Sequence, residues 1–376
     1  MKIAFTTSKE LNGTALLRDK LQELDDDWLA VHSYLNLIYV LLTKKNYINS
    51  IYSLSDIHCI YAHAICRFFK IQVPIILGYY HPEQWIGTVD VNFSKTRANA
   101  IRKIINTIPS TNIVFSSKHG AVSAHHFLKN NYSLESLFKN IVPGPIVQAF
   151  DPSAIKRIRP SKSLKILTIG RFVPFKISTI LSMIEVVDEL ALNGYDISYV
   201  IHGDGVAIDE VKKKINESSN PKNFKIGPFV DNDNYAKVCL SHDVFYGMGG
   251  AVIRAAMLKI PSLIAIQRCN EPVCYGLVSE HDHYISPVFG DDDPDIVKQD
   301  IRNAIINLYE NEYLFEIGID CFNASHAYSA TFTLEKLNKI MENAKFYNPE
   351  INMIDVFKIR IETYLSRFKK IKERDL

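Results

Sequence analysis

The chain has 376 residues, which is longer than one typical hydrophobic core, so two domains of similar size are expected. Its hydrophobic share of 47% and charged share of 22% are those of an ordinary soluble globular protein. The 43 basic and 41 acidic side chains leave a net charge of +2, which argues against a nucleic-acid-binding protein driven by bulk charge.

Six cysteines are scattered along the chain, without the paired spacing of a zinc site or the density of a disulfide scaffold. We therefore expect free thiols in a reducing compartment. The first residues enter a strand pattern with no signal-peptide core, and no charge-free stretch is long enough to cross a bilayer. These features predict a cytoplasmic protein that is at most attached to a membrane surface.

The first half of the chain alternates apolar runs with helical patterns, which predicts βα units and a parallel sheet. The expected strands are 2–7, 57–62, 74–79 and 112–116, and the expected helices are 14–24, 34–44, 63–70, 95–107 and 118–129. The pattern breaks at 140–146, and the polar stretch that follows predicts a linker.

A second alternating series follows the linker. Its expected strands are 165–169, 197–202, 224–226, 243–246 and 262–266, and its expected helices are 177–193, 207–217, 232–240 and 251–258. Two further helices are expected within 294–345 and an amphipathic one at 352–374. The predicted organisation is an N-terminal domain at 1–150, a linker at 151–163, a C-terminal domain at 164–345 and a C-terminal helix at 346–376. Two such domains are expected to bind ligands in a cleft at the carboxyl ends of their strands.

The clearest chemical signal lies between residues 164 and 261. An apolar strand ends at Gly170, and Arg171 and Lys176 follow as two fixed cations beside a backbone turn, which suits a diphosphate. A cluster of small residues precedes a later helical run: Gly247, Met248, Gly249 and Gly250. Such glycines let backbone N–H groups approach an anion. We expect both parts to bind one phosphate-bearing ligand. The alternatives are an exposed Arg/Lys pair and an ordinary tight turn.

The second half resembles the nucleotide-sugar domain of GT-B glycosyltransferases, in particular the large retaining family that builds bacterial surface polysaccharides. Four pieces carry the resemblance in the family's order: Gly170-Arg171 with Lys176, the turn 201–205, the run 226–230 with 243–245, and the segment 249–261. The N-terminal half fits more loosely, through 59–63, 73–81 and 141–144. The resemblance implies an α/β fold of two Rossmann-like, doubly wound domains facing a central cleft.

The resemblance also implies roles for single residues. His81 stands where the family has a histidine that touches the donor sugar, so it is predicted to be catalytic together with Arg171 and Lys176. Donor contacts are implied for Gly170, His202, Gly203, Phe229, Val230, Gly247, Met248, Gly249, Gly250 and Arg254. For Phe229 and Val230 a place in the core is the alternative. Acceptor-side candidates are Gly13, Thr14, Glu83 and Trp85. His63, Glu83 and Trp85 rank second to His81.

One departure concerns two family glutamates, separated by seven residues, that flank the glycine cluster. Tyr246 and Arg254 occupy those positions here. Arginine cannot accept a hydrogen bond from a ribose hydroxyl, although it can bind phosphate bidentately. Three alternatives remain open: a rearranged donor site, an unusual donor, or a catalytically inactive copy.

Three further features do not change the predicted function. The acidic triplets 25–27 and 291–293 suit solvated caps or turns, so no metal is expected. The helix at 95–107 carries Ile101, Ile104 and Ile105 on one face, which either packs into the core, the plainer account, or lies on an anionic membrane leaflet. The basic run 367–372 leaves the same two alternatives open.

The resemblance thus implies a hexosyl-type glycosyltransferase, retaining and independent of metal, that uses a nucleotide-diphosphate sugar and no cofactor. Its acceptor would be a bacterial surface glycan or lipid-linked oligosaccharide, of the O-antigen, capsule or lipopolysaccharide type. Peripheral contact with the inner face of the cytoplasmic membrane is also expected, and binding to nucleic acid is not. The alternatives are an inactive homologue acting as a binding or scaffold partner and, last, a nucleotide-sugar epimerase.

Overall fold

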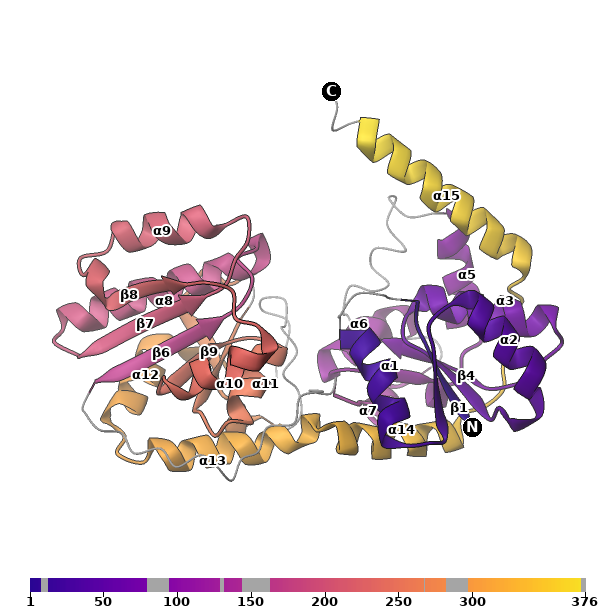
Figure 1. Ribbon diagram of the computed structural model, residues 1–376, viewed down its shortest axis with the longest axis horizontal. Helices are drawn as coiled ribbons and strands as arrows, with labels where there is room; N and C mark the ends of the chain where they lie inside the picture. The colour runs from indigo at the N-terminus through magenta and orange to yellow at the C-terminus, as the bar shows by residue number, and fades with distance from the viewer. Residues whose placement is uncertain are drawn as a thin grey trace. The chain divides into compact units, whose positions relative to one another are not determined.

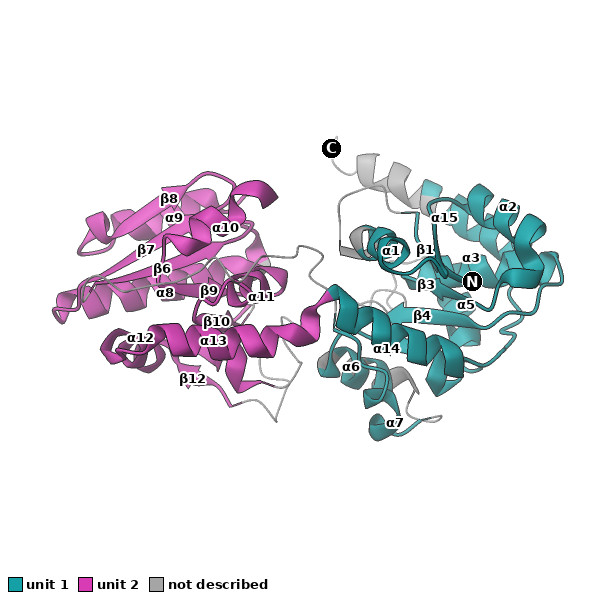
Figure 2. Cartoon of the chain, turned by 60° about the horizontal axis from the view of Figure 1, so that its bottom comes forward, with its two compact units in different colours: residues 1–147, 330–376 teal, residues 148–329 magenta. Residues whose placement is uncertain are grey.

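The computed structural model describes residues 1–7, 13–79, 95–128, 132–143, 163–266, 268–281 and 297–372. It divides into two compact units, coloured separately in Figure 2. Unit 1 comprises residues 1–147 and 330–376, and unit 2 comprises residues 148–329. Each unit has its own sheet with helices around it (Figure 1).

The described sheet of unit 1 is parallel throughout. In spatial order its strands are β2 (Trp28–Val31), β1 (Lys2–Phe5), β3 (Ser50–Ser53), β4 (Ile75–Tyr79) and β5 (Ile113–Phe115). Most residues in these short runs are buried, as expected for a parallel sheet that is covered on both faces. The strand order reverses between β1 and β3, which is where such sheets bind ligands.

Helices accompany this sheet in the described part of unit 1. They are α1 (Gly13–Leu24), α2 (Tyr34–Lys44), α3 (Asp56–Phe68), α5 (Lys95–Ile105), α6 (Lys118–Leu128), α7 (Leu134–Phe138), α14 (Ala330–Asn343) and α15 (Met353–Lys372). Helix α2 begins where Ser33 Oγ accepts the N–H of Asn36 at 3.1 Å. No helix in the described part of the chain is both long and apolar enough to span a membrane.

The predicted strand at 57–62 is wrong, and so is the comparison of 59–63 with a family strand. These residues lie inside α3, which Ser55 caps by accepting the N–H of His58. Residues 58–66 are all buried, so the helix has no polar stripe, and an apolar run of that kind cannot be distinguished from a buried strand by periodicity. In the described part of unit 1, the strands that the prediction missed are the four-residue β2 and β3.

Helix α14 belongs to unit 1, which corrects the predicted domain boundary. The sequence places residues 330–345 in the C-terminal domain, but Leu337 and Met341 pack in one core cluster with Trp28. Asn338 Oδ1 also accepts the indole N–H of Trp28 at 2.9 Å. Periodicity shows that this segment is an amphipathic helix, but it does not show which core receives the apolar face.

Leu337→Ala is expected to destabilise unit 1 by about 2–5 kcal/mol, because Leu337 is fully buried and its removal leaves a cavity. Hydrogen exchange on the full chain should show lost protection in β1 and β3 and unchanged protection in unit 2. Leu192→Ala, at an exposed position, is the control and should change neither. Loss of protection confined to unit 2 would contradict the assignment of α14.

The described sheet of unit 2 is mixed. In spatial order its strands are β12 (Gln299–Asp300), β11 (Val273–Leu277), β10 (Ser262–Ala265), β9 (Val244–Gly247), β6 (Leu164–Ile169), β7 (Ile197–His202) and β8 (Phe224–Gly227). Strands β11 and β12 pair antiparallel, and both are missing from the prediction. The order reverses between β6, which is followed by β7, and β9.

The helices of unit 2 agree with the prediction except in the last part. They are α8 (Pro174–Leu192), α9 (Ile208–Asn216), α10 (Asn232–Leu240), α11 (Gly250–Ala256), α12 (Ile301–Glu310) and α13 (Leu314–Ser325). The prediction of two helices within 294–345 is wrong, since α12, α13 and α14 all lie there.

Candidate functional site

A hollow in unit 2 lies at the carboxyl ends of β6 and β9. These strands are neighbours at the point where the strand order reverses, so the chain leaves them in opposite directions and a crevice opens. Its lining consists of Thr168, Ile169, Gly170, Arg171, Lys176, Thr179, Ile180, Tyr246, Gly247 and Met248. Its volume is only about 20 Å³, so a diphosphate would lie across its mouth. The structure thus brings the predicted cations beside the start of the glycine cluster, and their role in donor binding stays a prediction.

The two cations of the hollow differ in burial. Arg171 is exposed in the turn after β6, whereas Lys176 is partly buried in the first turn of α8. Burial lowers the pKa of Lys176, and the nearby charge of Arg171 lowers it further. The amino end of α8 adds positive partial charge at the same place. The combined field favours an anion.

The glycines after β7 hold the turn that carries Arg171. Gly170 N–H donates to the His202 carbonyl at 2.9 Å, and Phe172 N–H donates to the Asp204 carbonyl at 2.7 Å. Gly203 has φ +155°, and a Cβ there would lie 1.8 Å from the Gly170 carbonyl oxygen. The predicted donor residue Gly203 therefore has a clear structural role: only glycine permits this close approach.

His202, Phe229 and Val230 lie at the ends of β7 and β8, and the described lining of the hollow does not include them. The His202 Nδ1 atom is 3.0 Å from the Pro228 carbonyl, which can only accept, so Nδ1 carries the hydrogen. Phe229 is 63% exposed, which excludes the alternative that it is a core residue. Val230 is partly buried.

Tyr246, in the place of the first family glutamate, points into the core. Its side chain is 1% exposed, and burial raises its pKa well above the usual value. The hydroxyl has no hydrogen-bond partner among the described residues. At the strand end, the Tyr246 carbonyl accepts a hydrogen bond from Thr168 Oγ1 at 2.6 Å. The side chain therefore cannot replace a carboxylate beside a donor sugar.

Arg254, in the place of the second glutamate, lies against α10. Its guanidinium carbon is 3.7 Å from the centre of the Tyr235 ring, a cation–π contact, and Nη1 donates to Asn232 Oδ1 at 3.1 Å. Burial lowers the pKa of Arg254. The structure does not bring Arg254 into the described lining of the hollow.

The glycine cluster divides into two parts. Gly247 and Met248 line the hollow, whereas Gly249 and Gly250 begin α11. Gly249 is the N-cap with φ +61°, a conformation that favours glycine, and it makes no side-chain cap hydrogen bond. None of the described residues that line the hollow belongs to the seven-residue helix α11, so the strand end contributes more to the hollow than the helix does.

The acceptor-side predictions are only partly covered. His81, Glu83 and Trp85 lie outside the described residues. Gly13 begins α1 and Thr14 follows it, so both come after β1, next to the strand-order reversal of unit 1.

Sequence reasoning missed polar groups at this edge of unit 1. Thr7 N–H donates to His58 Nε2 at 2.9 Å, and burial lowers the pKa of His58 to about 4, with Arg97 and Arg18 adding to the shift. Asp56, whose side chain is 4% exposed, forms an ion pair with Arg97 at 2.7 Å. The Ser55 cap of α3 was the signal for these residues, and the mistaken strand at 57–62 hid it. In unit 2, Thr168 and Thr179 were also missed.

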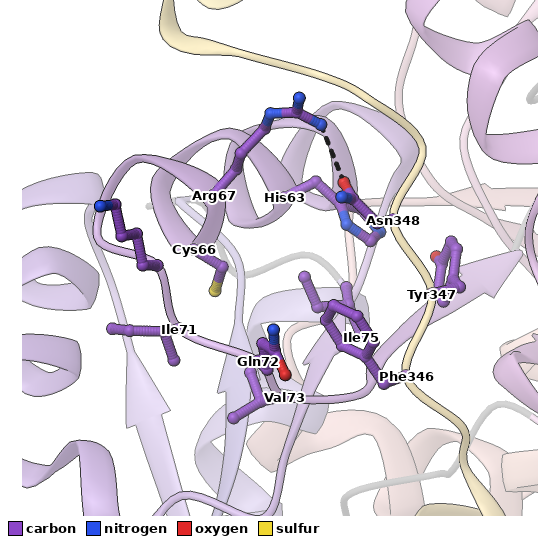
Figure 3. Close-up of a pocket in the computed structure, with 11 residues that line it drawn as sticks. His63, Cys66, Arg67, Ile71, Gln72, Val73, Ile75, Phe346, Tyr347 and Asn348 are labelled. Carbon is purple, nitrogen blue, oxygen red and sulfur yellow. Dashed lines mark hydrogen bonds between the residues drawn. The ribbon is translucent and has the colours of Figure 1, made fainter.

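A larger hollow of unit 1, of about 290 Å³, contains none of the residues predicted to bind the donor (Figure 3). It lies between the end of α3, the chain before β4 and residues 346–348. His63 is buried there, and burial lowers its pKa to about 3, so it stays neutral. This hollow lies toward the amino end of β4, away from the carboxyl edge of the sheet where ligands are expected.

Among the described residues, no three His, Cys, Asp or Glu side chains gather closely enough to hold a metal ion. Asp25 forms a turn, since its Oδ1 accepts the N–H of Asp27 at 2.9 Å. The triplet 291–293 lies outside the described residues.

Comparisons with known proteins extend this description. No protein-family model matches the sequence, and no curated protein matches it significantly. Among solved structures, TarM of S. aureus matches 82% of this chain at 15% identity with a TM-score of 0.50, and the chain spans 58% of TarM. HepE of Anabaena, solved with UDP, matches 91% of this chain and 99% of its own at 11% identity, with a TM-score of 0.56.

A third solved structure is WaaB, a lipopolysaccharide outer core galactosyltransferase in its apo form. It matches 91% of this chain and 99% of its own at 11% identity, with a TM-score of 0.58. Identities this low show the fold alone. Together with the two Rossmann-like α/β units, these similarities show that the chain has the GT-B fold that the sequence predicted.

Proposed function

We propose that this protein is a glycosyltransferase that moves a sugar from a nucleotide-diphosphate donor to a bacterial surface glycan or lipid-linked oligosaccharide. The observation that carries the proposal is the hollow at the strand-order reversal of unit 2, where Arg171 and Lys176 lie beside Gly247 and Met248. The similarity to HepE, solved with UDP, and to the galactosyltransferase WaaB supports it.

The proposed chemistry is the departure of a nucleoside diphosphate. When the bond between the anomeric carbon and the diphosphate oxygen breaks, negative charge grows on the leaving group. Arg171, Lys176 and the amino end of α8 would stabilise that charge, and preset cations of this kind can act without a metal. The acceptor hydroxyl oxygen would bond to the anomeric carbon, and its proton would pass to the departing diphosphate oxygen. Retention of configuration is proposed from the resemblance to the retaining family.

A non-catalytic binding protein is the second candidate. Tyr246 and Arg254 leave both glutamate positions without an acid. The burial of Tyr246 and the stacking of Arg254 on Tyr235 favour this candidate. An epimerase finds no support, because no carboxylate is found among the described residues that line the hollow.

Transfer and hydrolysis assays over a panel of nucleotide sugars test the proposal. Turnover of one donor that depends on an added glycan or lipid-linked acceptor supports the transferase. Nucleotide binding with no turnover of any donor identifies the binding protein.

We propose a cytoplasmic location with peripheral contact at the inner face of the cytoplasmic membrane.

The affinity for a nucleoside diphosphate is expected to depend on the charge of Lys176. Because the pKa of Lys176 is lowered from its ordinary value of 10.5, affinity should begin to fall at a lower pH than an exposed lysine would cause. Titration calorimetry between about pH 7 and pH 10 would measure the fall. Lys176→Arg keeps its charge over this range, so it should hold its affinity to higher pH. Identical profiles for the two proteins would contradict a role for Lys176.

A further inference from the structure

Exposed apolar side chains gather on two helices of unit 1. Those of α2 are Leu35, Tyr39 and Leu42, and those of α15 are Ile354, Phe357, Ile361 and Tyr364, all between 44% and 77% exposed. Their spacing of three or four residues places each set along one face of its helix. We call these seven residues together the α2–α15 surface.

These faces are additional to the faces that pack in the core. Helix α2 already buries Leu37, Val40 and Leu41. Helix α15 already buries Val356 and Ile359. Lys44 is the only charged residue in the eleven residues of α2. Helices that are apolar on a second, exposed face mark a site of interaction, because contiguous apolar patches are rare on a free surface.

Helices α2 and α15 both pack on α3 in unit 1. The Arg360 guanidinium carbon of α15 is 5.1 Å from the centre of the Tyr34 ring of α2, and Arg360 Nε donates to the Tyr61 hydroxyl of α3 at 2.9 Å. Figure 1 and Figure 2 both show α2 and α15 beside α3. Arg360 therefore links the three helices, and its contacts connect the two helices that carry the α2–α15 surface.

The charges around this surface favour an anionic partner. The acids of α15 interact with α5: Asp355 forms an ion pair with Lys103 at 3.9 Å, and Glu362 accepts the N–H of Thr96 at 3.2 Å. The neighbouring Lys44, Lys45 and Lys358 are exposed. The sequence of α15 continues with the basic residues Arg367, Lys369, Lys370 and Lys372.

We propose that the α2–α15 surface binds an anionic lipid bilayer. Its apolar side chains would enter the boundary between headgroups and acyl chains, and its lysines would contact lipid phosphates. Helix α5, the sequence's own candidate for this contact, is excluded because Ile101, Ile104 and Ile105 are buried in the core. Binding at this surface would bring the enzyme to a lipid-linked acceptor and does not depend on the donor hollow.

Co-sedimentation with vesicles tests the proposal. The full chain should bind vesicles of phosphatidylcholine with phosphatidylglycerol, bind pure phosphatidylcholine more weakly, and lose affinity as salt is raised. The double variant Leu42→Glu with Phe357→Glu should bind at least about tenfold more weakly, since two apolar contacts are lost and two negative charges are added. Leu192→Glu with Tyr313→Glu, at similarly exposed apolar positions of unit 2, adds the same charge and should bind like the wild type.

Several outcomes would overturn the proposal. One is equal binding of the wild type to vesicles with and without phosphatidylglycerol. Another is an equal loss of vesicle binding in the test variant and the control variant. A dimer in solution that the Leu42/Phe357 variant abolishes, without vesicle binding by the wild type, would identify a second copy as the occupant. Nucleotide affinity measured on the same preparations should be unchanged in both variants. Failure at the membrane is thereby separated from failure of the donor site.

Discussion

Lys176→Met is expected to lower kcat/KM for the nucleotide-sugar donor by about 100- to 1,000-fold, because it removes a preset charge from the leaving diphosphate. The same change should leave the stability of unit 2 unchanged or raise it. The folded-state pKa of Lys176 is lowered, so its charged form is disfavoured by folding. This penalty is fully present below the folded-state pKa and disappears as pH rises past 10.5, so the stability gain of methionine belongs to neutral pH.

This experiment is decisive because activity should fall while stability does not. A residue that only supports the fold would lose activity and stability together. Lys222→Met changes an exposed lysine of the same unit and should alter neither the steady-state rate nor the thermal unfolding temperature. A Lys176→Met protein with wild-type kcat/KM would remove this residue from the donor site.

Gly203→Ala is expected to destabilise unit 2 by about 3–5 kcal/mol, one of the largest effects of a single methyl group. The added Cβ would lie 1.8 Å from the Gly170 carbonyl oxygen, and φ +155° is strained for any side chain. For a unit of this size the loss corresponds to a fall of about 6–20 °C in the unfolding temperature. Nucleotide binding should be lost as well, because the turn that carries Arg171 must move.

The partner of this contact supplies the control. A Cβ at Gly170 would meet nothing within 4 Å, so Gly170→Ala should cost less than about 1 kcal/mol. Differential scanning calorimetry of the two variants compares the two sides of one backbone contact. Equal stability would show that the turns after β6 and β7 are not packed as described.

Some elements of unit 2 were predictable because a polar cap marks where they begin. Helix α10, for example, has the predicted bounds 232–240, and Asp231 caps it by accepting the N–H of Asn234 at 2.8 Å. Helix α3 shows the opposite case, since residues 58–66 are all buried and its apolar run was mistaken for a strand. The place of α14 depended on contacts with Trp28, about 300 residues away along the chain, which no local pattern reveals.

Only those parts of the candidate site that lie at strand ends were predictable from the sequence. Arg171 comes just after β6 and Gly247 ends the neighbouring parallel strand β9, and that is enough to bring them together. The sequence could not show that Tyr246 turns inward or that Arg254 stacks on Tyr235, because both depend on packing between elements. Nor could it show which apolar face of α2 lies outside the core.

The most direct test of the donor site is a crystal structure of the protein with a bound nucleoside diphosphate. We predict diphosphate oxygens within about 3 Å of Arg171 and Lys176, with backbone N–H groups of the 247–248 turn on the same ligand. The contradictory result is a nucleotide bound elsewhere while both side chains extend into solvent.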